Sequence, residues 1–93
     1  MKKAIRLIIS GNVQGVFFRQ FVKDEADKLG LHGFVKNLEN GDVEVVAEGE
    51  EDKIKELEKN CKKGPKFSEV KKVEFEKKAY SGKFKEFRII RFI

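Results

Sequence analysis

The stretch GFVKNLENGDVEVVAEG, residues 33–49, has the pattern of a β-hairpin. Its Asn40-Gly41 pair is a turn dipeptide, because both residue types tolerate a positive φ angle. Beyond the turn, Val43 and Val45 stand two positions apart and therefore share one face of a strand. The stretch predicts two antiparallel strands at the centre of the chain.

An amphipathic helix is expected on each side of this hairpin. Before it, apolar residues recur every three or four positions from Phe18 to Leu29, and Gly30 follows as a typical C-terminal stop. After it, a second apolar stripe runs through residues 51–63, which Gly64-Pro65 ends. The second helix has acidic residues in its first turn and lysines in its last turn, as the helix dipole favours.

A strand is expected outside each helix. Residues 4–9 are apolar on both faces apart from Arg6, which is typical of a central strand. VKKVEFEK from Val70 predicts another strand, Ser81-Gly82 a turn, and residues 84–93 a last strand. The order β-α-β-β-α-β, with room for a short extra strand at the end, predicts an α+β sandwich of ferredoxin-like type. We expect one domain over residues 1–93, with an antiparallel sheet and both helices packed on one face.

The composition favours an anionic partner and a reducing compartment. The 93 residues carry a formal net charge of +5, which suits a phosphate, a nucleic acid or an anionic membrane. One cysteine allows no internal disulfide and no thiolate metal cluster, so we expect a cytoplasmic protein. The apolar run after Met1 is short and interrupted by Arg6, and no segment has the length needed to span a membrane. Abundant lysine and glutamate, with no threonine or tryptophan, predict a thermostable protein.

The segment SGNVQGVFFRQF, residues 10–21, connects the first strand to the first helix. A glycine-containing turn there can point several backbone N–H groups at one spot beside the helix N-terminus, where the dipole favours an anion. The guanidinium of Arg19 can reach the same spot and donate paired hydrogen bonds to phosphate oxygens. The segment is therefore a candidate phosphate cradle. An ordinary turn remains an alternative, because no nucleotide-binding glycine motif is complete.

Two motifs resemble the signatures of the acylphosphatase family. GNVQGVFFR, residues 11–19, resembles the pattern Gly-x-Val-Gln-Gly-Val-x-Phe-Arg, and residues 33–49 resemble the second signature. The departures are Phe34, where many members have Trp, and Asn40, where many have Asp. The C-terminal residues 87–93 extend past the usual ending. The resemblance covers nearly the whole chain, and the family's fold agrees with the predicted order of strands and helices.

The resemblance implies hydrolysis of acyl phosphates to a carboxylate and inorganic phosphate. Asn37 would orient the attacking water, and the Arg19 side chain would bind the phosphoryl group. The backbone N–H groups implied in phosphate binding are those of Gln14, Gly15, Val16, Phe17, Phe18 and Arg19. We expect no metal site, because the acidic residues of the second helix are scattered and histidines are lacking. We also expect no cofactor, a small-molecule substrate and a monomer. A carboxylate leaves without protonation because its conjugate acid has a pKa of about 4, so no general acid is required.

Two alternatives without catalysis remain open at this stage. One is an RNA-binding module, because RNA-recognition domains share the ferredoxin-like fold. HGFVKN, residues 32–37, lacks the basic residue before Gly33 and the alternating aromatics that such modules use. The other is a module that binds acyl or carbamoyl phosphates without hydrolysing them. Retention of both Arg19 and Asn37 favours catalysis, because binding alone does not require an amide that orients water.

Several remaining side chains have ordinary structural interpretations. His32 is expected in a solvated loop. Cys61 lies on a helical apolar stripe and is expected to be a buried apolar residue rather than a nucleophile. Phe17, Phe18 and Phe21 are expected in the core, with Phe17 as a second possibility at the edge of the cradle.

Overall fold

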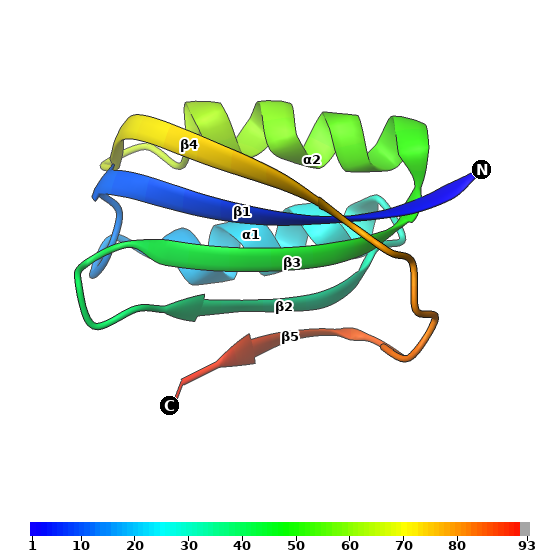
Figure 1. The fold of residues 1–93 in the computed structure, drawn as a ribbon. Helices are drawn as coiled ribbons and strands as arrows, with labels where there is room; N and C mark the ends of the chain where they lie inside the picture. The colour runs from blue at the N-terminus through cyan, green and yellow to red at the C-terminus, as the bar shows by residue number, and fades with distance from the viewer. Residues whose placement is uncertain (92–93) are drawn as a thin grey trace.

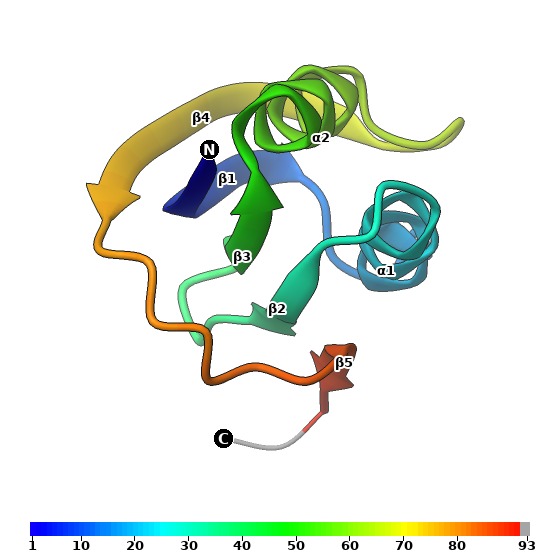
Figure 2. The same cartoon turned by 90° about the vertical axis from the view of Figure 1, so that its right-hand side faces the viewer.

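A five-stranded sheet with both helices on one face forms the protein, in a computed structural model that describes residues 1–91 (Figure 1). Figure 2 shows α1 and α2 on the same side of the sheet. The strand order is β4-β1-β3-β2-β5. The bounds are β1 Lys2–Asn12, α1 Phe18–Lys28, β2 His32–Asn37, β3 Val43–Glu50, α2 Glu51–Lys63, β4 Glu69–Lys78 and β5 Phe87–Ile90.

The predicted α+β ferredoxin-like arrangement is confirmed through its first six elements. α2 has the predicted bounds, and α1 ends one residue before the predicted Leu29. The central hairpin forms with Phe34 opposite Val46 and with Asn37 opposite Val43. β1 lies between β3 and β4, and both pairs are antiparallel. β1 is therefore central, as its apolar residues on both faces predicted.

One hydrophobic core lies between the sheet and the helices. β1 contributes every second residue to it, because strand side chains alternate between faces. The helices contribute one stripe each, at three- and four-residue spacing. The fully buried side chains of largest volume are Phe18, Phe87, Leu7, Ile9, Leu31 and Leu57.

The last strand is where the antiparallel prediction was wrong. β5 pairs with β2, and the pair is parallel, with Gly33 beside Phe87 and Lys36 beside Ile90. The chain leaves β4 at one edge of the sheet and returns at the opposite edge (Figure 1). Burial of Phe87 on the helix side of the sheet accounts for this extra strand, because it removes a large apolar side chain from water. Residues 92–93 of the predicted last strand lie outside the described residues.

Glu48 anchors the connection that crosses from β4 to β5. Its side chain accepts hydrogen bonds from the Ser81 N–H at 3.0 Å, the Ser81 hydroxyl at 2.8 Å and the Gly82 N–H at 2.9 Å. The residue is buried, so these donors replace the water that an isolated carboxylate would need. The predicted Ser81-Gly82 turn is thus held against β3 rather than closing a hairpin between β4 and β5.

We expect Glu48→Gln to lower the free energy of unfolding by about 2–4 kcal/mol. The substitution removes the charge and replaces one acceptor oxygen by an NH₂ group that faces other donors, and hydrogen bonds to charged groups contribute about 1.5–3 kcal/mol each. Denaturant unfolding would measure the change. Glu50→Gln is the matched control, because Glu50 is exposed and pairs only with the N-terminal amino group. Equal losses in the two variants would contradict the anchoring role.

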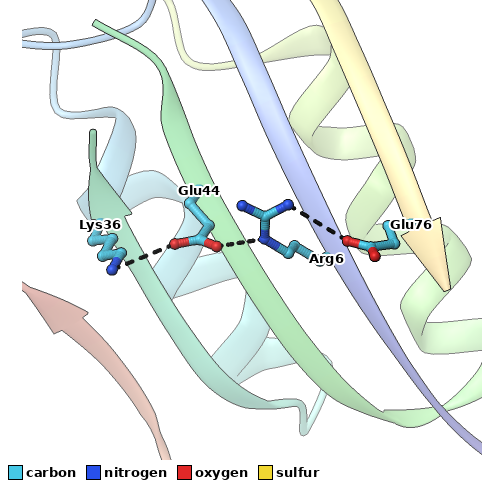
Figure 3. A network of polar contacts seen from close by, with 4 residues as sticks. All are labelled: Arg6, Lys36, Glu44 and Glu76. Carbon is cyan, nitrogen blue, oxygen red and sulfur yellow. Dashed lines mark hydrogen bonds and ion pairs between the residues drawn. The ribbon is translucent and has the colours of Figure 1, made fainter. Parts of the chain in front are cut away.

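Charged side chains form a network across the face of the sheet opposite the helices (Figure 3). Arg6 on β1 contacts Glu44 on β3 and, at 3.4 Å, Glu76 on β4. Lys36 on β2 lies 3.6 Å from the other oxygen of Glu44. The hydrogen bond to Glu44 is the main cause of the raised pKa of Arg6. The network links four strands and fixes the end of β2 immediately before Asn37.

Cys61 is fully buried on α2, as predicted. Burial raises the pKa of its thiol to about 12, because a thiolate would lose its hydration. The thiolate is the nucleophilic form, so this cysteine is unreactive in the folded protein at neutral pH. His32 begins β2 rather than lying in a loop, and it is exposed. No helix in the described part of the chain has the length and apolar character that crossing a bilayer requires.

Candidate active site

A pocket of about 430 Å³ opens where the ends of four segments meet. The loop after β1 and the first turn of α1 form one wall. The C-terminal ends of the parallel strands β2 and β5 form the other, since parallel strands end at the same edge of the sheet. The lining residues are Val13, Gly15, Phe17, Phe18, Arg19, Gln20, Asn37, Ile89 and Arg91.

The loop before α1 curves through two residues of left-handed conformation. Gly15 has φ 73°, and Phe17, the residue that caps α1, has φ 61° and ψ 22°. Glycine adopts this region without strain, but phenylalanine does not, and such strain is concentrated at functional sites. Successive turns of this kind aim backbone N–H groups into a concave surface that suits an anion.

The N-terminus of α1 is uncapped within residues 1–91: no side chain there donates or accepts a capping hydrogen bond, and no acidic residue stands in the first turn. The first helical hydrogen bond runs from the Phe21 N–H to the Phe17 carbonyl oxygen at 3.0 Å. The N–H groups of the preceding residues are therefore free of helical bonds, and the positive end of the dipole faces the pocket.

Arg19 lies in this first turn and lines the pocket. Its side chain is half-buried. Among residues 1–91, no carboxylate lies within ion-pairing distance of its guanidinium. The guanidinium is thus an unneutralised positive charge beside the uncapped helix end.

Asn37 ends β2 and lines the same pocket as Arg19. Its Oδ1 atom is buried and has no hydrogen-bond partner within the described chain. A buried polar atom without a hydrogen-bond partner typically lowers stability by about 1–3 kcal/mol. The Oδ1 atom of Asn37 therefore does not stabilise the fold. The structure therefore brings together the two side chains that the sequence analysis selected.

The Gln14 side chain has a role that the sequence analysis did not find. Its Nε2 donates hydrogen bonds to the carbonyl oxygens of Leu38 and Asp42, both at 2.9 Å. These acceptors flank the hairpin turn directly after Asn37. Gln14 therefore ties the loop to the turn and sets the spacing between the two walls of the pocket. Neither Gln14 nor Val16 is among the residues that line it.

We expect Gln14→Ala to lower both stability and activity. Losing two hydrogen bonds to partly buried carbonyl oxygens should reduce the free energy of unfolding by about 1–3 kcal/mol. The loosened loop should also raise KM, because its N–H groups are no longer held at a fixed distance from Asn37. Unfolding curves and steady-state kinetics would check both effects. Unchanged stability would show that the tie is not formed in solution.

Two residues of the first motif, Phe17 and Gly11, do not lie where a simple interpretation of that motif would place them. Phe17 is 86% exposed, so the expectation of a core position was wrong, and its side chain flanks the pocket instead. Phe18 is buried as predicted. Gly11 belongs to β1 rather than to the loop, and a Cβ there would collide with the carbonyl oxygen of Glu69. Only Gly15 serves the curvature of the loop.

Four further residues that were not predicted from the sequence also line the pocket: Val13, Gln20, Ile89 and Arg91. The last two reach the pocket because β5 runs parallel to β2, which no local pattern in the chain indicates. Within residues 1–91, no group of three or more His, Cys, Asp or Glu side chains is arranged to hold a metal ion.

Comparisons with known proteins agree with this geometry. The acylphosphatase family model matches residues 5–89. An acylphosphatase from Caldanaerobacter subterraneus subsp. tengcongensis is 47% identical over 89 residues, covering 96% of this chain and 99% of the relative. One from Pseudomonas aeruginosa is 51% identical over 74 residues, covering 80% of this chain and 81% of the relative.

Solved structures show the same likeness. An acylphosphatase from Coxiella burnetii superposes with a TM-score of 0.91 at 42% identity, covering 96% of this chain and 93% of that one. The acylphosphatase from Bacillus subtilis has a TM-score of 0.91 at 39% identity, covering 97% and 99%. The family match, the relatives of similar length and the shared fold have one consequence: the chain belongs to the acylphosphatase family and is an enzyme that hydrolyses acyl phosphates to a carboxylate and inorganic phosphate.

Proposed function

We propose that the loop, Arg19 and Asn37 carry out this hydrolysis with separate roles. The backbone N–H groups of residues 14–19 and the Arg19 guanidinium bind the phosphoryl group, and Asn37 orients the attacking water. The observation that carries the proposal is one pocket lined by an arginine and an amide oxygen that both lack a protein partner among residues 1–91.

The chemistry needs charge stabilisation more than proton transfer to the leaving group. Phosphoryl transfer passes through a loose transition state, with negative charge spread over the equatorial oxygens. The carboxylate departs unprotonated because its conjugate acid has a pKa of about 4. A rigid cradle of N–H groups and one guanidinium stabilises this charge without reorganising during the reaction.

Asn37 is suited to the water because an amide offers both a donor and an acceptor and carries no charge. A carboxylate at this position would repel the phosphate dianion. No described carboxylate or histidine lines the pocket to act as a base. In the proposed mechanism, an oxygen of the substrate's own phosphate accepts the proton of the attacking water, while the P–O bond to the acyl group breaks.

Hydrolysis in water enriched in oxygen-18 tests where the water held at Asn37 attacks the substrate. Attack by a water held at Asn37 occurs at phosphorus, so mass spectrometry should find the solvent oxygen in the inorganic phosphate. The spontaneous reaction under the same conditions is the control. Solvent oxygen in the carboxylate would mean attack at the acyl carbon and would contradict the proposed position of the water.

A binding module without catalysis is not favoured. The chain is also similar to part of HypF, at 29% identity and a TM-score of 0.85, although it spans only 12% of that longer protein. HypF was solved in a phosphate- and nucleotide-bound form. The curated relatives of matching length are acylphosphatases, and the presence of Asn37 beside Arg19 supports turnover rather than binding alone.

The remaining properties that we propose are those of a small, single-domain cytoplasmic enzyme. We infer a monomer that covers residues 1–93 as one domain, does not bind nucleic acid, and is thermostable. The single buried thiol supports a reducing compartment, and the ion-pair network across four strands supports thermal stability, because such networks gain importance at high temperature.

A further inference from the structure

Arg91 places a second positive charge in the active-site pocket. It follows β5 directly, and its neighbour Ile90 pairs with Lys36 in the parallel ladder. Asn37 and Arg91 directly follow the last pair of this ladder, and both line the pocket. Arg91 lines the pocket together with Ile89, whereas Arg88 and Ile90 line a separate hollow. This alternation is the two-residue period of a strand.

The charge in this pocket is one-sided. Among residues 1–91, its lining contains Arg19 and Arg91 but no aspartate or glutamate. Among residues 1–91, neither guanidinium has a carboxylate within ion-pairing distance. By contrast, Arg88 on the same strand pairs with Glu86 at 2.7 Å. Two like charges in one pocket repel each other, and a multiply charged anion between them relieves that repulsion. A phosphate ester or anhydride near neutral pH is such an anion.

The position of Arg91 determines which part of the substrate it can reach. If Asn37 orients the water, the leaving acyl group lies on the far side of the phosphorus, because attacking and leaving oxygens are roughly in line. Arg91 stands on the Asn37 side. Its guanidinium can therefore contact the phosphoryl oxygens, which carry the charge, whereas the acyl group projects away from it.

We propose that Arg91 is a second phosphate-binding residue, which contacts the phosphoryl group from the β5 side of the pocket while Arg19 and the loop hold it from the α1 side. This inference rests on the proposed roles of Arg19 and Asn37. It adds a contribution from the end of β5, the last strand of the sheet. Arg91 should act equally on all acyl phosphates and on the product phosphate.

The test compares Arg91→Gln with Arg88→Gln, which removes the same charge from β5, outside the pocket. Using acetyl phosphate and benzoyl phosphate, we expect Arg91→Gln to lower kcat/KM roughly 5- to 20-fold for both. This loss is at or below the low end of the range for one hydrogen bond to a charged group, because Arg91 is exposed to solvent. Competitive inhibition by inorganic phosphate should weaken in parallel, and Arg91→Lys should recover part of the loss. Arg88→Gln should change either value by no more than about twofold.

Added salt provides a further readout. Arg91 is exposed, so the difference between wild type and Arg91→Gln should shrink as sodium chloride is raised, because salt screens exposed charges. Equal behaviour of Arg91→Gln and Arg88→Gln would overturn the inference. A loss confined to one acyl group would also overturn it, since Arg91 would then bind the acyl portion.

The failure of this inference can be told apart from failure of the proposed roles. If wild type is active and Arg19→Ala is not, but Arg91→Gln matches Arg88→Gln, only the role of Arg91 is wrong. If Arg19→Ala retains full activity, the proposed roles are wrong. In that case, calorimetric titration with inorganic phosphate still tests the role of Arg91 by itself. An unchanged phosphate affinity in Arg91→Gln would reject phosphate binding by Arg91, and a weakened affinity would support it.

Discussion

Arg19→Ala should lower kcat/KM for benzoyl phosphate by about a hundred- to a thousandfold or more. Removal of one preorganised donor from a developing charge typically costs about 3–4 kcal/mol. Arg19 supplies a full charge as well as its donors, and no other described side chain of α1 can replace it at this end of the helix. Steady-state assays of phosphate release would measure the loss.

The fold should survive this change, because Arg19 makes no ion pair within residues 1–91. Arg88→Ala is the matched control, and its activity should stay near that of wild type. Added guanidinium ion should partly restore Arg19→Ala, since it can occupy the vacated volume. If Arg19→Ala unfolds at the same denaturant concentration as wild type and retains full kcat/KM, the proposed role of Arg19 would be contradicted.

Asn37→Ala should lower kcat strongly, by about a hundredfold or more, and leave inhibition by inorganic phosphate nearly unchanged. The amide contributes to the position of the water, which matters only in the chemical step, whereas the cradle and Arg19 hold the phosphate in both states. An interaction that exists mainly in the transition state appears in kcat rather than in ground-state affinity. Steady-state kinetics with phosphate as competitor separate the two quantities.

Asn37→Asp and Asn40→Ala complete this comparison. The aspartate keeps the size but adds a negative charge beside the phosphate, so it should weaken phosphate binding as well as kcat. Asn40 lies in the hairpin turn, where it bonds only Asp42, and its removal should spare activity. Loss of phosphate affinity in Asn37→Ala with an unchanged kcat would show that Asn37 binds the phosphate instead of the water.

The elements that sequence predicts well here are those with a complete local signal. α2 has an apolar stripe, suitable charges at both ends and a Gly-Pro stop, and its observed bounds are the predicted ones. The hairpin has its turn dipeptide and alternating valines. In each case, local propensity and the tertiary fold favour the same structure, which is the condition under which local patterns are reliable.

The last strand had no such signal. Whether Phe87 and its neighbours pair with β4 or β2 depends on long-range packing against α1, and a turn at Ser81-Gly82 does not distinguish the two. The anchoring of that turn by Glu48 is equally non-local, because it joins residues far apart in sequence. The parallel pairing in turn brings Ile89 and Arg91 to the pocket, so these residues could not be assigned to it beforehand.

In the site, as in the fold, the features with a local sequence motif were predicted, and those that depend on long-range contacts were not. Arg19 and Asn37 were selected from motifs, and the structure places both in one pocket. The motif did not predict which way the Phe17 side chain points, and the structure shows it exposed, on a residue with left-handed backbone conformation at the start of α1. Gln14 was selected for its backbone, whereas its side chain makes the visible contacts, to carbonyl groups on a different element.

The most direct test of the central claim is the initial rate of inorganic phosphate release from benzoyl phosphate, measured with a metal chelator present. The comparison is between wild type and the double variant Arg19→Ala/Asn37→Ala, both verified as folded. The account predicts rapid release by wild type and a rate close to the spontaneous one for the double variant. Wild-type activity in the double variant, or no release above the spontaneous rate by wild type, would contradict it.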